Sequence, residues 1–212
     1  MAGAPPERVP LSLVDGAGGR RRTTAAVLVV VVLAAAVGGV VGLIGGRVPA
    51  LVAAAVVAVP LGLLAWGSAR RQVWLEGSQV VARTFGKRRV DLRTARGLEL
   101  VVTDLRGTRT VGLLVSGDDK RAVNVSLAVY SGTGGRELGI LVLRKLADLL
   151  AGSENTAGLV FSQLLVAQLR AEAKGEPAPD RPLYRLASVA PEGRLAQRLK
   201  PEAITRFVAS LD

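Results

Sequence analysis

The stretch that decides the fold runs from Ala25 to Gly46 and reads AAVLVVVVLAAAVGGVVGLIGG. It contains no charged residue, and as an α-helix rising about 1.5 Å per residue it covers the hydrocarbon core of a bilayer, which is about 30 Å thick. A second uncharged run extends from Ala50 to Gly67, with Trp66 near its end, where an indole suits the headgroup level. Only residues 47–49 separate the two runs, so the sequence predicts a pair of antiparallel transmembrane helices.

Basic residues flank this pair of helices on one side. Arg20 to Arg22 precede the first run and Arg70 and Arg71 follow the second, whereas the connection carries Arg47 alone. Because basic flanks stay in the cytoplasm, we expect a multi-pass protein of the cell membrane with both termini cytoplasmic. Two alternatives stay open: a cleaved secretory signal, since Ala34 to Ala36 offers an A-x-A pattern, and two buried helices of a soluble protein.

Three glycines in the first run, Gly38, Gly42 and Gly46, recur every four residues. This spacing lets helix backbones approach closely in lipid, so we expect packing at these positions, either within the hairpin or between copies of the chain. The alternative is that glycine is simply frequent in such segments. Because no charge lies inside either run, the hairpin offers no path for ions or protons and is expected to be an anchor.

The composition excludes most familiar catalytic centres. The chain has 212 residues, with neither Cys nor His, so disulfides, thiolate nucleophiles, imidazole bases and zinc sites that need these ligands are ruled out. No Gly-x-Ser-x-Gly or Ser-x-x-Lys motif supplies a nucleophile for acyl transfer. We therefore predict no catalytic residue, no metal site and no cofactor, and expect that the protein is not an enzyme. Its richness in Ala, Gly, Val and Arg is typical of a GC-rich, actinobacterial-type genome.

Beyond Arg71 the pattern changes to short alternating runs separated by turn residues, which is typical of antiparallel strands. In the last of these runs we expect Val123, Val125, Leu127 and Val129 to share one face. Alternation buries one face of the sheet only, so the sheet needs a cover. Six strands are predicted: Val73–Leu75, Gln79–Phe85, Arg88–Leu92, Leu98–Val102, Val111–Val115 and Val123–Val129.

Helices that follow in the chain can supply this cover. Arg136 to Leu150 carries apolar residues at helical spacing, and a second helix is expected from Thr156 to Lys174, with Asn155 as its N-cap. The proline-rich run Gly175 to Pro182 is interpreted as a linker. A short tail helix is predicted from Pro201 to Leu211, docked on the body by default or on a partner.

These segments predict an α+β protein, in which a transmembrane hairpin precedes a small antiparallel sheet or partly open barrel of about six strands capped by C-terminal helices. The expected organisation is a disordered cytoplasmic segment, the hairpin, a β domain with its capping helix, an additional amphipathic helix, and a linker with the tail helix. The corresponding residues are 1–22, 23–69, 70–152, 153–174 and 175–212.

The opening of the β domain, Val73 to Leu92, reads VWLEGSQVVARTFGKRRVDL and resembles the first hairpins of bacterial pleckstrin-homology-like domains. An aromatic residue opens the first strand, a small turn reverses it, and a basic third strand leads into an apolar-polar pattern. The resemblance covers Val73 to Leu150 and leaves out the helix at 156–174 and the tail. It implies a partly closed barrel capped by a helix, tethered behind a pair of membrane helices and used for binding rather than catalysis.

The chain is basic, with 28 Lys and Arg against 17 Asp and Glu, so its expected partners are anions. Its densest basic cluster is opposed only by Asp91, and we predict that it contacts anionic lipid headgroups; the alternative is an ordinary solvated strand face. Nucleic acid is not expected, since Phe85 is the only aromatic among these residues. The cluster consists of Arg83, Lys87, Arg88, Arg89, Arg93 and Arg96.

A glycine-rich loop, Gly132 to Gly135, precedes a predicted helix and could hold a phosphate, although a flexible strand-to-helix connection explains it as well. Likewise, Asp118 and Asp119 are more simply a hairpin turn than half of a calcium site. Two functions stay open. The first is a membrane-tethered module that binds lipid or protein at the inner leaflet. The second is an accessory subunit of a larger complex, or a homo-oligomer, assembled through the glycine-spaced helices and the tail helix.

Overall fold

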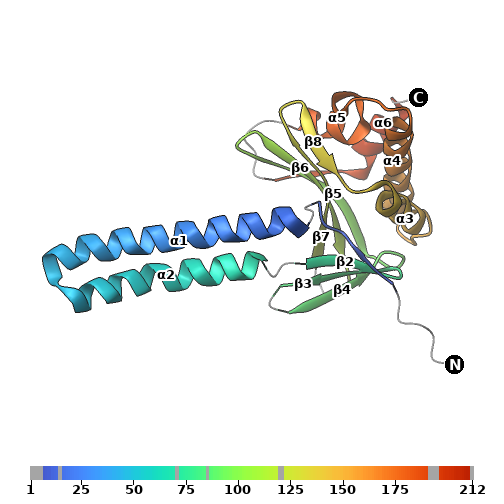
Figure 1. The fold of residues 1–212 in the computed structure, drawn as a ribbon. Helices are drawn as coiled ribbons and strands as arrows, with labels where there is room; N and C mark the ends of the chain where they lie inside the picture. The colour runs from blue at the N-terminus through green and yellow to red at the C-terminus, as the bar shows by residue number, and fades with distance from the viewer. Residues whose placement is uncertain are drawn as a thin grey trace. The chain divides into compact units, whose positions relative to one another are not determined.

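The computed structural model describes residues 7–13, 16–69, 72–84, 86–118, 122–190 and 196–210. It confirms the predicted α+β class, with two apolar helices, two antiparallel sheets and C-terminal helices (Figure 1). The chain divides into a helical unit, residues 14–71 with 83–86, and a soluble domain formed by the remaining residues. Arg70, Arg71, Phe85 and Asp119, which entered the predictions, lie outside the described residues.

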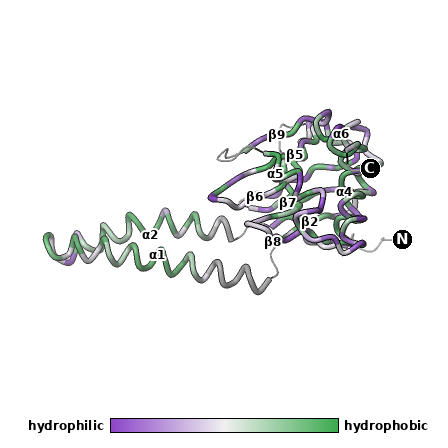
Figure 2. Tube along the Cα trace, turned by 90° about the horizontal axis from the view of Figure 1, so that it is seen from above, coloured by the Kyte–Doolittle hydropathy of each residue, from purple (hydrophilic) through white to green (hydrophobic). Residues whose placement is uncertain are grey.

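The helical unit is a hairpin of α1 (Gly16–Gly45) and α2 (Arg47–Ala69), joined at Gly46. Gly46 has a φ of +82°, a conformation that glycine adopts without steric cost, and so it can reverse the chain in a single residue. Within the two helices, Thr24–Gly45 and Arg47–Ala65 are long and apolar enough to cross a membrane. Figure 2 shows hydrophobic residues along most of both helices, in contrast to the mixed pattern of the soluble domain.

The two helices pack through small residues. A Cβ atom added at Gly38 would lie 3.0 Å from Cβ of Ala54 and 3.1 Å from the carbonyl oxygen of Ala50, and one added at Gly42 would lie 3.1 Å from Cβ of Ala50. Side chains at either glycine would therefore force the backbones apart. The structure thus places Gly38 and Gly42 against α2 of the same chain, while Gly46 makes the turn.

The first sheet has four strands in the order β1-β2-β3-β4. Its first strand lies in the segment that was expected to be disordered. That expectation is wrong for residues 8–10, which pair antiparallel with β2, and for residues 16–22, which form the first turns of α1. For β1 the cause is burial, because Val9 packs against the core and Leu11 is only 3% exposed. The strands are β1 (Arg8–Pro10), β2 (Gln72–Glu76), β3 (Gln79–Arg83) and β4 (Lys87–Asp91).

The second sheet has five strands in the order β8-β7-β6-β5-β9, and neither sheet closes on itself. The prediction of six strands therefore gave too few. It located β2 to β7, but β1, β8 and β9 have only three or four residues each, too few to show an alternating pattern. The strands of this sheet are β5 (Gly97–Leu105), β6 (Thr108–Ser116), β7 (Ala122–Ser131), β8 (Gly134–Glu137) and β9 (Gln197–Leu199).

A bulge changes which residues of β7 face the core. Val111 pairs with Ala128 but Gly112 pairs with Ser126, so Leu127 is an extra residue on β7. Side chains after a bulge change face relative to simple alternation. The prediction that Val129 shares the face of Val123 is therefore wrong. Tyr130 is buried on that face instead, with 2% of its surface exposed.

The C-terminal helices are partly as predicted. Asn155 caps α4 as expected, since its side-chain oxygen accepts a hydrogen bond from the Ala157 amide at 3.0 Å. The first covering helix starts later than predicted because residues 134–137 form β8. The linker was wrongly extended, because Pro182 is the first residue of α5. The elements are α3 (Ile140–Ala151), α4 (Thr156–Ala173), a 3₁₀ turn (Ala178–Asp180), α5 (Pro182–Val189) and α6 (Pro201–Ala209).

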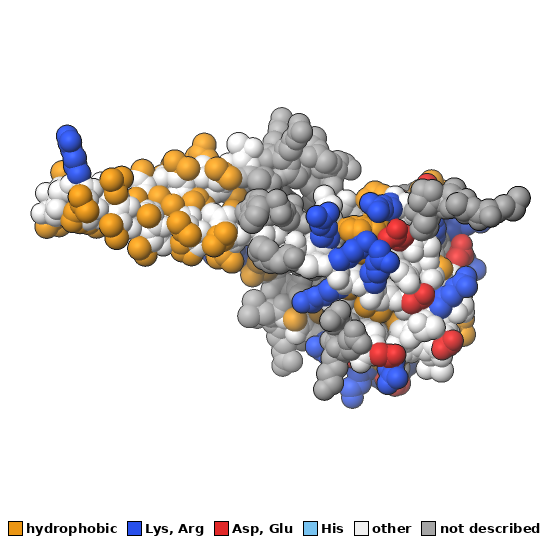
Figure 3. All heavy atoms as spheres, turned by 90° about the horizontal axis from the view of Figure 1, so that it is seen from below, with side chains coloured by type: hydrophobic (Ala, Val, Ile, Leu, Met, Phe, Trp, Pro, Cys, Tyr) orange, Lys and Arg blue, Asp and Glu red, His pale blue; other side chains and the backbone are white. Residues whose placement is uncertain are grey.

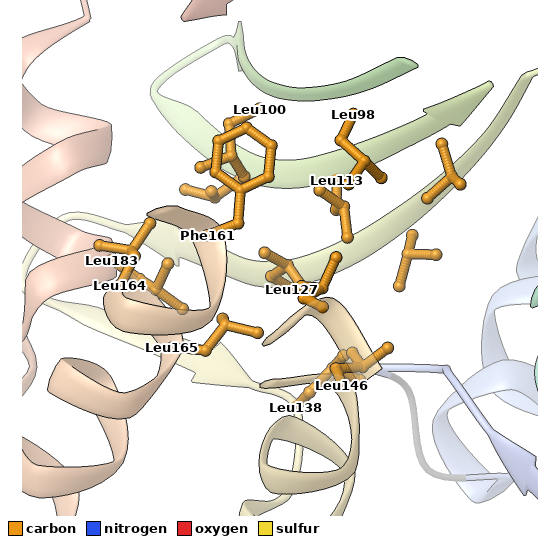
Figure 4. Close-up of a cluster of buried hydrophobic side chains, with 14 of the residues drawn as sticks. Leu98, Leu100, Leu113, Leu127, Leu138, Leu146, Phe161, Leu164, Leu165 and Leu183 are labelled. Atoms are coloured by element: carbon orange, nitrogen blue, oxygen red, sulfur yellow. The ribbon is translucent and has the colours of Figure 1, made fainter. Parts of the chain in front are cut away.

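One hydrophobic core holds the soluble domain together. Figure 4 shows Phe161 of α4 with its ring beside Leu100 of β5, and Leu164 and Leu183 meeting on the helical side. The buried amide oxygen of Gln168 accepts the Leu183 amide at 3.0 Å and so fixes α5 on α4. The tail helix α6 docks on the body, as expected by default, with Ile204 fully buried against this core.

Candidate functional site

Strand alternation defines an outer face of the four-stranded sheet. Leu75 and Val90 point into the core, with 0% and 5% of their surfaces exposed. Because neighbouring side chains on a strand point to opposite faces, Trp74 lies on the outer face of β2, and Lys87 and Arg89 lie on the outer face of β4. We call the side of this sheet opposite Leu75 and Val90 the outer face.

An indole lies between two cations on the outer face. The guanidinium carbon of Arg8 and the Nζ atom of Lys87 are each 5.8 Å from the centroid of the Trp74 ring, within the range of a cation–π interaction. Arg8 reaches the ring from β1, where it is paired with Glu76. Lys87 reaches it from β4, two strands away. We call these three residues the Trp74 cluster.

The carboxylates of the outer face are recessed, while its cations are exposed. Arg8 lies 3.9 Å from Glu76, yet the side chain of Arg8 is 67% exposed and that of Glu76 only 16%. Asp91 is held by local hydrogen bonds, accepting from Ser78 Oγ at 2.8 Å and from the Arg93 amide at 2.9 Å. The surface offered to a partner is therefore cationic, and Figure 3 shows basic side chains gathered on this side of the soluble domain.

The six basic residues predicted as one cluster are not brought together. Lys87 and Arg89 share the outer face, but Arg88 lies on the opposite side of β4, although it is also exposed. Arg83 is an exposed residue at the end of β3. A run of basic residues along a strand is divided between two faces, so its density in the sequence overstates its density on either one.

Arg93 and Arg96 lie in the connection between β4 and β5, away from the strand. Their backbone carbonyls are acceptors that hold the loop between α3 and α4: Arg93 accepts the Glu154 amide at 2.8 Å and Arg96 accepts Asn155 Nδ2 at 2.8 Å. The Arg96 side chain is paired with Asp118. Both arginines therefore occupy a connection with a structural role, although the side chain of Arg93 is exposed.

Sequence reasoning missed Arg8 and Trp74 as members of a site. Trp74 was noticed only as the aromatic residue that opens the first strand, and Arg8 lay in a segment expected to be disordered. Arg8 lies close to Trp74 only because β1 pairs with β2 in this register, although the whole helical hairpin separates the two strands in the sequence. The only available signal was Trp74 itself, an aromatic residue next to a basic segment.

The glycine-rich loop has a different role from either one proposed for it. Gly132 and Thr133 form the turn between β7 and β8, so no helix begins at this loop and it lacks the helix N-terminus that a phosphate site would use. Gly135 is needed for packing, because a Cβ atom there would collide with the ring of Tyr130. The prediction that residues 132–135 connect a strand to a helix was wrong, because they lead from β7 into β8.

Near this turn, a buried polar network ties the proline-rich segment to the sheet. The Tyr130 hydroxyl donates to Glu137 at 2.6 Å, and Arg181 donates to the other oxygen of Glu137 at 2.7 Å. Burial, together with the hydrogen bond to Glu137, raises the pKa of Tyr130 far above its ordinary value. The hydrogen bond to Glu137 raises the pKa of Arg181 as well, so that both groups keep their protons. The network is a structural one.

A cavity of about 640 Å³ lies between this network, the β5–β6 turn and α5. Three of its polar side chains have partners: Tyr184 donates to the Gly132 carbonyl at 2.9 Å, Ser188 to the Tyr184 carbonyl at 3.0 Å, and Arg109 to the Ala187 carbonyl at 3.4 Å. These bonds fix α5 on the sheet. Within the part of the chain that the structure describes, no three His, Cys, Asp or Glu residues are grouped as a metal site would need.

The fold and the outer face together define an α+β domain with a cationic surface, attached to a helical hairpin long and apolar enough to span a membrane. Comparisons with protein families, curated proteins and solved structures found no match to this chain.

Proposed function

We propose that this chain is a multi-pass protein of the cell membrane whose cytoplasmic domain is a non-catalytic binding module held at the membrane surface. The supporting observation is the pairing of β1 with β2. In the chain, β1 precedes the helical hairpin and β2 follows it. The two strands are hydrogen-bonded neighbours, with Val9 opposite Leu75 and the Leu11 amide donating to the Val73 carbonyl at 2.9 Å.

This pairing has a consequence for membrane topology. Two strands of one sheet lie on the same side of a bilayer, so a hairpin inserted between them leaves from and returns to that side. The arginine flanks independently favour the cytoplasm for that side. The exposure of the apolar helices also supports a bilayer: of the two candidate spans, 11% and 0% are buried, whereas the core helix of a soluble protein is mostly buried.

The likeness to pleckstrin-homology-like domains belongs to this proposal. Its support is an order of elements in which antiparallel strands are followed by a covering helix. The accessory-subunit alternative loses part of its basis, because Gly38 and Gly42 are occupied by α2 and Ile204 is buried in the body. The binding-module function is therefore preferred.

Topology can be tested directly because the chain has no native cysteine. Single substitutions Glu7→Cys, Val48→Cys and Leu105→Cys place a thiol before the hairpin, in its turn and in the soluble domain. A membrane-impermeant maleimide added to intact cells should label only the Val48→Cys protein, and all three after permeabilisation. Labelling of Glu7→Cys or Leu105→Cys in intact cells would contradict the proposal.

A further inference from the structure

We propose that the Trp74 cluster is the point at which the soluble domain contacts the bilayer, with Arg8 and Lys87 pairing with the phosphates of anionic lipid headgroups and the indole at headgroup level. This inference rests on the proposed function, since it requires the hairpin to lie in the membrane. It goes further by replacing the contiguous basic cluster with a discontinuous site that includes Arg8 and Trp74.

The composition of the cluster fits a membrane surface. A tryptophan has an apolar body and one polar N–H group, and arginine and lysine carry a cation on an apolar stem, which suits them to the boundary between oil and water. In the described part of the chain, the Trp74 Nε1–H is buried and has no hydrogen-bond acceptor. Headgroup phosphate oxygens would supply the counter-charge for Arg8 and Lys87, whose cations lie beside the indole ring.

Chain connectivity keeps the cluster within reach of the membrane. An extended chain spans at most about 3.5 Å per residue, so Trp74 can lie no further than about 18 Å from Ala69, the last residue of α2. A tethered site needs little intrinsic affinity, because the tether supplies a high effective concentration. Each basic group near an anionic leaflet biases the docked state by about fivefold, so reversing one charge should shift docking by about thirtyfold.

An acidic protein segment is the main competing partner for a cationic face. The lipid is favoured because Arg8 and Trp74 lie on the two strands attached directly to the hairpin, which are the strands that a tether would hold nearest the headgroups. Arg89, on the same face, adds a further exposed cation. A protein ligand would have no reason to prefer these two strands.

The test uses the full-length chain with Trp66→Phe, which leaves Trp74 as the only tryptophan. The protein is reconstituted into vesicles of phosphatidylcholine, with or without phosphatidylglycerol, that contain lipids brominated near the headgroup as contact quenchers. We expect quenching of Trp74 in the anionic vesicles, a decrease on raising salt, and little quenching in phosphatidylcholine alone. Arg8→Glu and Lys87→Glu should each abolish the anionic quenching.

Arg93→Glu is the matched control, because it makes the same charge change at an exposed arginine outside the outer face. Equal loss of quenching with Arg93→Glu, or equal quenching in both kinds of vesicle, would overturn the inference. If the protein floats with the vesicles but Trp74 is never quenched, the inference fails and the proposed function stands. If the protein does not float with them, both fail. A shift of Trp74 fluorescence caused by polyglutamate, without quenching by lipid, would assign the face to an acidic protein and overturn the lipid contact.

Discussion

The helical hairpin and the soluble domain differ in the size of the side chains that they bury. In the hairpin, the large apolar residues Leu43 and Ile44 are 90% and 88% exposed, while Ala34 is 8% exposed. In the soluble domain, most large apolar residues are inside, and Phe161 is only 1% exposed. The two units therefore differ in the sizes of the side chains that they bury, which is the difference expected if the hairpin lies in a bilayer, as we propose.

The physical reason lies in the hydrophobic effect. In water, burying a large apolar side chain gains about 1.5 to 3 kcal/mol, so the soluble domain fills its core with Leu, Val and Phe. In lipid, an apolar side chain gains nothing by leaving the acyl chains, so helices associate through close van der Waals contact between small residues. The glycines facing Ala50 and Ala54 provide that contact.

The largest expected effect comes from removing the hairpin in two ways, one that keeps β1 and one that deletes it. We predict that replacing residues 14–71 by a short Asn-Gly turn yields a folded domain that is soluble without detergent, because it keeps β1 paired with β2. We call this protein the bridged domain. A chain that begins at Gln72 loses the burial of Leu11 and the ladder hydrogen bonds of β1. Its stability should be lower by about 4 to 6 kcal/mol, a large part of the total for a small domain.

Urea unfolding of these two soluble proteins measures the difference. Equal midpoints would show that β1 contributes nothing to the domain, and would also remove the topological argument for a same-side hairpin. A bridged protein that still needed detergent would instead show that the apolar surface is not confined to the hairpin.

Truncating one large side chain in each unit tests the contrast in burial. Phe161→Ala should destabilise the soluble domain by about 3 to 5 kcal/mol, because it leaves a cavity in the core. Leu43→Ala in the full-length protein should leave the thermal unfolding of the hairpin in detergent almost unchanged, because that side chain faces outward. A comparable loss at Leu43 would indicate that the exposed face of the hairpin is covered by protein.

Enlarging a small residue tests the same contrast in the opposite direction. Gly38→Val should weaken the pairing of α1 with α2 by about 1 to 3 kcal/mol, since a Cβ there meets the Ala50 backbone. Gly39→Val is the matched control, because a Cβ at Gly39 meets nothing within 4 Å. Denaturation by sodium dodecyl sulfate in mixed micelles, followed by circular dichroism, compares the two variants. Equal effects would mean that helix propensity rather than contact sets the stability.

The sequence predicted the units more successfully than their details. Two charge-free runs and the alternation of β5 to β7 are local patterns, and they located the hairpin and most of the second sheet. The strand β1 and the helix α5 were missed because each is held by contacts with residues far away in the chain. Leu11, next to β1, is buried in the core, and α5 is fixed on α4 by the hydrogen bond from the Leu183 amide to Gln168. The candidate site was missed for the same reason, since only strand pairing brings Arg8 to Trp74.

The buried network of the soluble domain predicts a response to alkaline pH. An unfolded tyrosine loses its proton near pH 10, whereas burial and Glu137 keep Tyr130 protonated in the folded protein. The contribution of this raised pKa is fully present below pH 10 and is lost as the pH rises above it, by about 1.4 kcal/mol per pH unit. Urea unfolding of the bridged domain should therefore show a decline above pH 10 that is shallower in Tyr130→Phe.

Tyr184→Phe is the control for this decline, because it removes the other tyrosine and leaves Tyr130 and Glu137 in place. It should retain the steep alkaline loss. If Tyr130→Phe and the parent domain lose stability in parallel above pH 10, the hydroxyl of Tyr130 is not held by Glu137 in solution.

The smallest expected effect is at the turn between β5 and β6. Arg106 has a φ of +53° and Gly107 a φ of +75°, the backbone of a two-residue hairpin turn whose first position favours Asn, Asp or Gly. An arginine in this left-handed conformation costs about 1 kcal/mol, so Arg106→Asn should stabilise the bridged domain by about 0.5 to 1 kcal/mol. Arg106→Ala removes the same charge but lacks the short polar side chain that lets Asn adopt this conformation through local hydrogen bonds, and should give no gain. Equal stabilisation by both substitutions would assign the effect to charge rather than to backbone conformation.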